Sequence, residues 1–292
     1  LLPLLLTMLC GGLGQELPQE AQALYGLADL APLDTELEEY VAGVVAAEMP
    51  AAFPEEALKA QAFAAITYQV RQMQAGGRRA VLYDVGQAYL SEAEQKEKWG
   101  EGYALYAGKI HSAVRATAGE IMTYDGEPIL AAFHAQSGGR TEDAAHVWNT
   151  AVPYLKSVDS PEGDEVPNYH SQVVLSSQQV QEAALAAYPG ADLSGEPSSW
   201  FGQAVRDEGG TVTSIPFGGL TLTGGQVRSM LSLRSAAFTV TWDGENFTFD
   251  VTGYGHGVGM SQYGANAMAK EGKNFTDILT WYYTGTQVDA LW

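Results

Sequence analysis

The sequence predicts an α+β protein: a helical core with short β-strands plus an α+β subdomain, together forming a cleft. Residues 36–73 show helical spacing of apolar side chains over two consecutive segments. Residues 121–133 hold two apolar runs around an Asp125-Gly126 turn, which is typical of a β-hairpin. Residues 165–245 mix one helical segment with short β-rich runs and joints of Gly, Ser and Pro.

These patterns divide the chain into four parts. We expect residues 1–34 to be an anchor remnant and linker, 35–164 the first part of the core, 165–245 the subdomain and 246–292 the C-terminal part of the core. The chain has 292 residues, 46% hydrophobic and 17% charged, so it can bury a full core and is not of the disordered type. A net charge of −20 argues against nucleic acid as a partner and against adhesion to anionic lipid, because both are polyanions.

Residues 1–9 are strongly apolar but too few to span a bilayer, which needs about 20 residues. We expect them to be the end of a trimmed signal or membrane anchor, or else an artificial extension. Cys10 is the only cysteine, so no internal disulfide can form, and the residues before it match a lipid-attachment signal poorly. We therefore expect an extracytoplasmic protein anchored to the cell membrane by its N-terminal segment, with residues 11–35 as a tether.

The most informative residue is a glutamate at the end of the first predicted helix, residues 36–48. An apolar stripe runs along this helix through Leu37, Val41, Val44 and Val45, and Glu48 continues the same stripe. The Met-Pro pair at 49–50 then ends the helix. A carboxyl on a buried face tends to keep its proton and can act as a general acid. The alternative is a frayed helix end with this glutamate in water.

The next helix, which starts at Pro54, carries a second charge on an apolar face. Glu55 and Glu56 occupy its first turn, where the helix dipole favours negative charge. Lys59 falls in the middle of the apolar stripe. It is either a lysine whose stem lies along the core with its ammonium in water, or a cation inside a cleft shared with Glu48.

The rest of the first half alternates between helical and β-like segments. Residues 91–107 predict a helix with a charged, solvated face. Residues 111–119 read as β-like and run into a strand at 121–124, which the Asp125-Gly126 turn reverses into a strand at 128–133. That strand leads into a polar, glycine-rich segment, 134–142, and such segments after buried strands often carry site residues.

In the second half, residues 176–187 predict a helix, and residues 210–216 and 238–242 predict short strands. Residues 247–251 are expected to form the last strand, followed by the glycine-rich segment 253–264 and a helix from 262 to 270. A nucleotide-binding loop does not fit, because Met260 stands where the third glycine belongs and no phosphate-binding lysine follows. The five histidines form no tight pair of metal ligands, and neither Ser137 nor Ser261 lies in a Gly-x-Ser-x-Gly turn.

Four blocks of sequence, in this order, together resemble one family over residues 35–290. They are Val-Ala-Ala-Glu-Met-Pro (45–50) with Glu-Ala-Leu-Lys-Ala-Gln-Ala (56–62), Phe-His-Ala-Gln-Ser-Gly-Gly-Arg-Thr-Glu (133–142) with Val-Trp (147–148), Leu-Ser-Leu-Arg-Ser (231–235), and Gly-His-Gly-Val-Gly-Met-Ser-Gln-Tyr-Gly-Ala (255–265). On these blocks the chain resembles the stage II sporulation protein D family, which also includes amidase-enhancer proteins.

The resemblance implies a membrane-anchored lytic transglycosylase that cuts peptidoglycan glycan strands, denuded of stem peptides, during engulfment in sporulating bacteria. It implies a cell-wall amidase and a membrane scaffold, stage II sporulation proteins P and M, as partners. The family's catalytic glutamate matches Glu48, and its active-site lysine matches Lys59. We expect further substrate contacts from Tyr68, His134, Ser137, Trp148, His256, Gln262 and Tyr263.

The chemistry of this reaction explains why one carboxyl suffices. Glycosidases that use water need two carboxylates, whereas a lytic transglycosylase uses the 6-hydroxyl of the sugar as its nucleophile. Glu48 would protonate the glycosidic oxygen and then remove the 6-hydroxyl proton, giving 1,6-anhydro ends. Lys59 would meet the lactyl carboxylates of the glycan.

Two departures from the family pattern leave an alternative open. Ile66 stands where family members commonly have arginine, which removes an expected anion contact. Cysteines that hold zinc near residues 134–146 in some members are missing, so we expect no metal and no other cofactor. The competing function is a non-catalytic amidase enhancer or scaffold that uses the same groove only to bind glycan.

Overall fold

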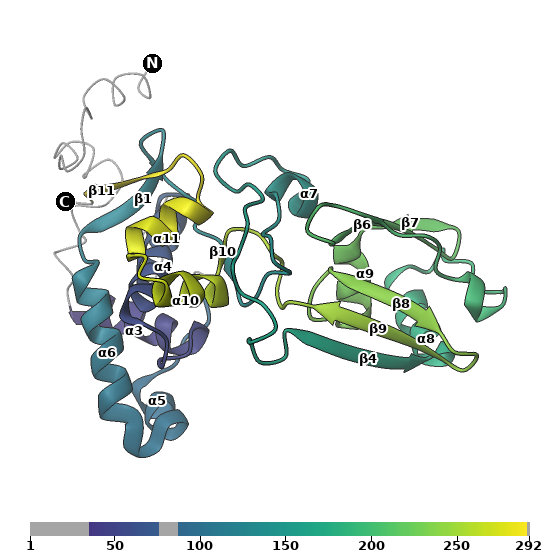
Figure 1. Cartoon of the computed structure of the whole chain (residues 1–292), viewed down its shortest axis with the longest axis horizontal. Coiled ribbons are helices and arrows are strands. Elements are labelled where there is room, and N and C mark those ends of the chain that lie inside the picture. The colour runs from purple at the N-terminus through teal and green to yellow at the C-terminus, as the bar shows by residue number, and fades with distance from the viewer. Residues whose placement is uncertain (1–34, 76–86, 291–292) are drawn as a thin grey trace. The chain divides into compact units, whose positions relative to one another are not determined.

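The computed structural model describes residues 35–75 and 87–290 (Figure 1). The chain divides into unit 1, which comprises Leu1–Phe133 and Ala265–Trp292, and unit 2, His134–Gly264. Helices and short strands occur in both units, which confirms the α+β class. The expected anchor, Cys10, the linker and a predicted loop at residues 76–79 lie outside the described residues. Within the described residues, no helix combines the length and the apolar character needed to cross a bilayer.

Unit 1 is a group of helices beside a small sheet (Figure 1). Its sheet is antiparallel with the strand order β11-β1-β2. Its elements are α3 (Thr35–Glu48), α4 (Glu55–Ala75), α5 (Glu92–Trp99), a 3₁₀ turn (Gly100–Gly102), α6 (Tyr103–Ala116), β1 (Glu120–Tyr124), β2 (Glu127–Pro128), most of α10 (Gln262–Lys270), α11 (Phe275–Tyr282) and β11 (Gln287–Ala290).

The apolar stripes predicted for the first two helices form the core of unit 1. Helix α3 buries Val41, Val44 and Val45, and α4 buries Leu58 and Phe63. Helices α6 and α11 pack on α4, so the three-to-four-residue spacing of each stripe is satisfied by a neighbouring helix. Both predicted helices are therefore confirmed, with α3 ending at the residue before the Met-Pro pair.

Two sequence predictions in unit 1 are wrong. The single helix expected over 91–107 is two helices, because Gly100 adopts a φ of 51° and ends α5. The β-like segment expected over 111–119 instead continues α6 to Ala116 and ends in a turn at residues 117–119. Its apolar side chains Ala107, Ile110 and Val114 follow helical spacing and are buried against α3 and α4. Tertiary packing thus outweighs the β preference of the local residues.

The hairpin at residues 120–128 is confirmed, with a shorter second strand than predicted. Asp125 (φ 52°) and Gly126 (φ 79°) adopt the left-handed backbone that a tight two-residue hairpin turn requires. Strand β2 covers only Glu127–Pro128, and the residue after it, Ile129, still donates its N–H to the Met122 carbonyl of β1 at 3.1 Å.

Unit 2 contains two three-stranded antiparallel sheets with the orders β4-β9-β8 and β5-β6-β7 (Figure 1). A shared apolar core includes Phe217, Phe247 and Phe249 from the strands and Val180 and Val227 from the helices. Its elements are β3 (Phe133–His134, at the unit boundary), α7 (Ala144–Trp148), β4 (His170–Ser176), α8 (Ser177–Ala187), a 3₁₀ turn (Pro197–Ser199), β5 (Val205–Arg206), β6 (Val212–Phe217), β7 (Leu220–Leu222), α9 (Gly224–Leu231), β8 (Phe238–Trp242), β9 (Asn246–Thr252) and β10 (Met260–Ser261).

The predicted helices at 176–187 and 262–270 and the strands at 210–216 and 238–242 are confirmed within one or two residues. Strand 247–251 forms as β9, but it is not the last, because β10 and β11 follow it. Unit 2 begins at His134, earlier than the expected boundary at 165. The reason is that Gln136 and Glu142 bridge to Tyr254 and Val258, which ties the segment after β3 to the loop after β9.

Candidate active site

Glu48 lies at the C-terminal end of α3, at the edge of the core. The residue after it, Met49, still donates its backbone N–H to Val45 at 3.0 Å. Val44 and Val45 on the same stripe are fully buried, whereas Glu48 is half-buried. The Glu48 carboxyl therefore lies where the apolar face of α3 reaches the protein surface.

Glu48 lines an open groove of about 400 Å³. It is formed entirely within unit 1, by residues 47–52 and by the side chains Lys98, Trp99 and Tyr106. The rings of Trp99 and Tyr106 lie 5.7 Å apart at an interplanar angle of 57°. Flat aromatic faces beside a carboxyl provide an apolar surface for sugar rings together with a proton donor or acceptor.

Burial raises the pKa of Glu48 above the ordinary glutamate value, and the backbone amide of Ala88 partly offsets this. The position at the negative end of the α3 dipole disfavours the charged form as well. Gly43 helps to bring the residue-88 segment close, since a Cβ there would lie 2.2 Å from the Tyr89 ring. Leu90 donates its N–H to the Gly43 carbonyl at 3.1 Å across the same contact.

Among the described residues that line the groove, the cation is Lys98, which the sequence analysis did not single out. Its Nζ donates to the carbonyl of Ala46 in the last turn of α3 at 2.9 Å, where a positive charge complements the helix dipole. Lys98 and Trp99 are adjacent in the sequence, and Tyr106 follows Trp99 by seven residues. This spacing is the sequence signal that could have identified these three residues as one side of the groove.

Lys59 does not line the groove around Glu48. Its Nζ lies 3.1 Å from Glu55 and 2.8 Å from Glu56, within the first turn of its own helix. The hydrogen bond that Lys59 donates to Glu56 is the main cause of the raised pKa of Lys59. Tyr68 lies farther along α4 and is half-buried. Substrate binding by either residue stays a prediction.

In unit 2 the structure brings three predicted residues together. The His134 ring lies 5.7 Å from the His256 ring, and the Trp148 ring lies 5.4 Å from His256. His134 Nδ1 is 3.3 Å from the Val258 carbonyl, and Val258 donates its N–H to His256 Nδ1 at 3.1 Å. The loop around Val258 thus fixes the orientation of both imidazoles.

His134 is a neutral imidazole in this setting. Burial and the neighbouring His256 lower its pKa to about 3. A proton on Nδ1 satisfies the Val258 carbonyl and leaves a lone pair on Nε2, which is buried without a hydrogen-bond partner among the described residues. His134 is therefore suited to accept a hydrogen bond and not to act as a base near neutral pH.

Ser137, predicted to contact sugar, is buried and hydrogen-bonded inside unit 2. Its N–H and its hydroxyl donate to Glu162 Oε1 at 2.7 and 2.8 Å. Ser160 and Ser261 donate to the same buried carboxylate. Ser137 therefore holds the loop in place, and direct contact with substrate stays a prediction.

Gln262 and Tyr263 start helix α10. Gln262 is buried, and Tyr263 is half-buried and donates its backbone N–H to the Ala135 carbonyl at 3.1 Å. Over the described residues, no group of three or more His, Cys, Asp or Glu side chains is arranged to hold a metal ion. The expectation that the chain binds no metal stays a prediction.

These features define an α+β protein with a carboxyl-centred, aromatic groove on its helical unit. The SpoIID family model, described as stage II sporulation protein, matches residues 33–124. Stage II sporulation protein D of Bacillus subtilis (strain 168) is 43% identical over 272 residues, covering 91% of this chain and 78% of that protein. The amidase enhancer of the same organism is 28% identical over 306 residues, covering 85% of this chain and 40% of that protein. The chain belongs to the stage II sporulation protein D family.

Proposed function

We propose that this protein is a lytic transglycosylase that cleaves peptidoglycan glycan strands denuded of stem peptides, with Glu48 as its acid and base. One observation carries the proposal: the Glu48 carboxyl has a raised pKa and lines an open groove of about 400 Å³ beside two aromatic rings. A polysaccharide needs an open groove, and an acid needs a proton to give near neutral pH.

The reaction can proceed with this one carboxyl. Protonated Glu48 gives its proton to the glycosidic oxygen as the bond from that oxygen to C1 breaks, which leaves an oxocarbenium-like centre. The carboxylate then takes the proton of the 6-hydroxyl on the same sugar while that oxygen bonds to C1. The product carries a 1,6-anhydro ring, Glu48 regains its proton, and the intramolecular nucleophile supplies the proximity advantage that a bound water lacks.

The groove supplies binding groups of the right kinds. Trp99 and Tyr106 offer stacking faces for sugar rings, and Lys98 places a positive charge beside Glu48 for a lactyl carboxylate. Such a local cation matters because the chain as a whole carries a net charge of −20. In unit 2, the cluster of His134, Trp148 and His256 supplies further candidates for sugar contacts.

We also propose the cellular setting that the family suggests. The relatives named stage II sporulation protein D and amidase enhancer support a role in the cell wall of sporulating bacteria, in concert with an amidase. The protein would act outside the cytoplasm, held at the membrane by its N-terminal segment. A membrane scaffold and the amidase, stage II sporulation proteins M and P, would be its partners during engulfment.

A second candidate function is a glycan-binding enhancer of the amidase, without cleavage. The 28% identity to an amidase enhancer favours it, as does Ile66, which is buried where family members commonly have arginine. In that case the same groove would bind glycan strands and present them to the amidase.

Mass spectrometry of amidase-treated sacculi separates the two candidates. Wild type should release anhydro-muropeptides, and Glu48→Gln should release none while still co-sedimenting with the glycan, since glutamine keeps the shape of the side chain. Equal release by both proteins would overturn the assignment of Glu48. Binding without anhydro products from the wild type would establish the enhancer.

A further inference from the structure

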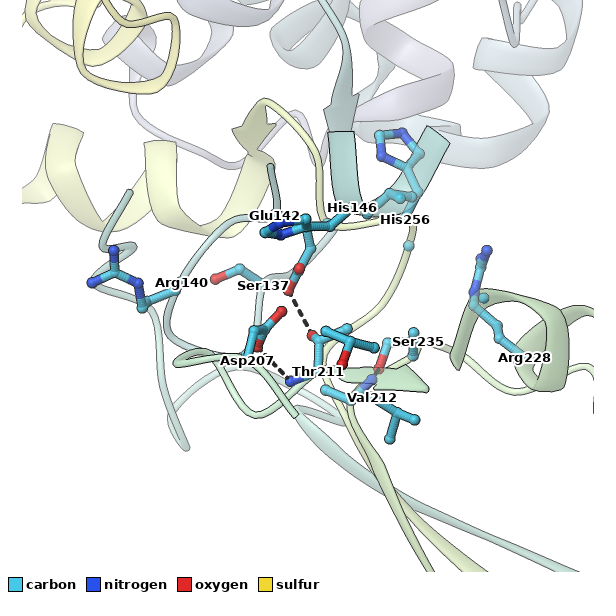
Figure 2. A pocket seen from close by; sticks show the side chains of 18 of the residues that line it. Ser137, Arg140, Glu142, His146, Asp207, Thr211, Val212, Arg228, Ser235 and His256 are labelled. Atoms are coloured by element: carbon cyan, nitrogen blue, oxygen red, sulfur yellow. Dashed lines mark hydrogen bonds between the residues drawn. The ribbon is translucent and has the colours of Figure 1, made fainter. Parts of the chain in front are cut away.

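Unit 2 contains a second pocket, formed without any residue of unit 1 (Figure 2). We propose that this pocket binds the acetamido group of an N-acetylated amino sugar. The inference deepens the proposed function, since glycan strands carry such groups. It concerns different residues from those of the Glu48 groove and is therefore tested separately.

Two carboxyl side chains at the centre of the pocket lie against each other. Figure 2 shows Glu142 and Asp207 with their carboxyl groups directed toward one another beside Thr211. Thr211 Oγ1 donates to Glu142 Oε1 at 2.6 Å. Asp207 Oδ1 accepts the backbone N–H groups of Gly209 and Thr211, each at 3.0 Å. The side-chain hydrogen bond between the two carboxyls needs one shared proton, which Glu142 donates.

The surroundings of Glu142 favour the protonated form of its carboxyl. Burial is the main cause of its raised pKa, about 8, and the hydrogen bond and charge of Asp207 raise it further while Thr211 lowers it. Because this proton is held between Glu142 and Asp207, the pair offers its remaining lone pairs as acceptors, for example to a hydroxyl of the sugar. Loss of the proton would place two adjacent negative charges in the pocket, which would force the carboxyls apart and disrupt the site.

The local backbone fixes the position of Glu142. Its N–H donates to the Gly257 carbonyl at 2.7 Å. Gly257 has a φ of 82°, and a Cβ on it would lie 2.5 Å from Glu142 Cγ. Only glycine allows this approach, so the loop that carries His256 also holds Glu142 in the pocket.

A second observation points to a missing ligand group. Gln136 lines the same pocket and is 4% exposed. Its Nε2 donates to the Pro167 carbonyl at 3.1 Å, but its Oε1 is buried without a hydrogen-bond partner among the described residues. Such an acceptor costs about 1–3 kcal/mol, which a donor such as an acetamido N–H would relieve.

The volume of the pocket and the charges of the side chains that line it fit a small neutral group. The cavity measures about 80 Å³, room for about six waters at ~10–15 Å³ each, which suits an acetamido group and part of its sugar ring. Apolar Val147, Val212 and Ala237 can face the methyl group. The charged and titratable side chains that line the pocket are of both signs, which disfavours either a free cation or a free anion: Glu142, Asp207, Arg140, His146, Arg228 and His256.

The test uses calorimetry with the full chain carrying Glu48→Gln, which prevents cleavage, and Trp99→Ala, which removes a stacking face from the unit 1 groove. Triacetylchitotriose should bind at pH 7, and cellotriose, which has hydroxyls in place of the acetamido groups, should not. No binding of the acetylated trimer, or equal binding of the two sugars, would overturn the inference. Neither result would bear on whether wild type releases anhydro-muropeptides, so failure of the proposed function remains distinguishable.

A pH comparison then tests the role of Glu142. The dissociation constant should rise about 30-fold from pH 7 to pH 9.5 as Glu142 ionises from a pKa of about 8. Glu142→Gln keeps the donor to Asp207 and the acceptor for Thr211, so its constant should change less than about two-fold over the same interval. His146 and His256 line the pocket in both proteins, so their contribution is the same in the two measurements. The same pH dependence in both proteins would overturn the role assigned to Glu142.

Discussion

Replacing Glu142 by glutamine should change how the stability of the protein depends on pH. In the folded protein burial raises the pKa of Glu142 to about 8, whereas an ordinary glutamate has a pKa of 4.5. Between those two values the folded state holds a proton that the unfolded state has lost. The free energy of unfolding therefore falls as pH rises through this interval, and the stabilisation is complete only below the unfolded pKa.

The size of the effect follows from the difference between the two pKa values. Each pH unit changes the unfolding free energy by about 1.4 kcal/mol, so the interval from 4.5 to about 8 amounts to about 5 kcal/mol as an upper bound. Glutamine resembles the protonated carboxyl and cannot ionise. Glu142→Gln should thus match wild type near pH 4.5 and exceed it in stability by several kcal/mol at pH 8.5.

Urea unfolding at a series of pH values between 4.5 and 9, followed by circular dichroism and tryptophan fluorescence, measures this difference. Glu38→Gln in unit 1 is the matched control with the opposite sign. Burial raises the pKa of Glu38, but Arg115 and His111, each 2.8 Å away, lower it by more. That variant should be less stable than wild type at neutral pH and equal to it only at acid pH. A constant difference between Glu142→Gln and wild type across the series would refute the shared proton.

Three further predictions concern residues that hold the two sites in place. Glu162→Gln should lower the unfolding free energy by about 3 kcal/mol, because an amide nitrogen would face serine donors; exposed Glu165→Gln should change it little in the same urea experiment. Gly257→Ala should cost about 2 kcal/mol more than Gly272→Ala, because both glycines have positive φ but only Gly257 touches Glu142. Lys98→Met should weaken glycan co-sedimentation about five-fold, and Lys59→Met less, because Lys59 is paired with Glu55 and Glu56.

Each of these three predictions has an outcome that would contradict it. A Glu162→Gln protein as stable as wild type would mean that the hydrogen bonds from Ser137, Ser160 and Ser261 to Glu162 do not stabilise the fold. Equal stability losses for the two glycine variants would remove the steric role of Gly257. A greater loss of binding in Lys59→Met than in Lys98→Met would place the glycan-binding cation on α4 and not in the groove.

Helices with a continuous apolar stripe could be predicted from the sequence because each stripe meets a neighbouring helix. Helix α3 ends where the Met-Pro pair requires, and α10 begins where predicted. The failure over 111–119 has a physical reason, since Ile110 and Val114 favour strands locally but lie on one helical face. Only their contact with α3 and α4 decides between the two conformations.

The site could be predicted only in part because its partners are distant in sequence. Glu48 could be singled out, since its misfit lies within one helix. The hydroxyl of Ser137 is held by Glu162, and the proton of Glu142 is shared with Asp207, both distant in sequence. No local sequence pattern predicts either contact.

Among the described residues, two carboxyls of raised pKa line pockets, and their surroundings decide which can act as the acid. Glu142 shares its proton with Asp207 in a cavity of about 80 Å³, so giving the proton away would leave two adjacent charges. Glu48 lines a groove of about 400 Å³, and burial is the main cause of its raised pKa. Transfer from Glu48 therefore costs only its own desolvation, and the basic limb of the pH–rate profile should follow Glu48. In Glu142→Gln that limb should stay where it is in wild type, measured as anhydro-muropeptide release at saturating glycan. A shift of the limb would show that the proton comes from the pair in unit 2.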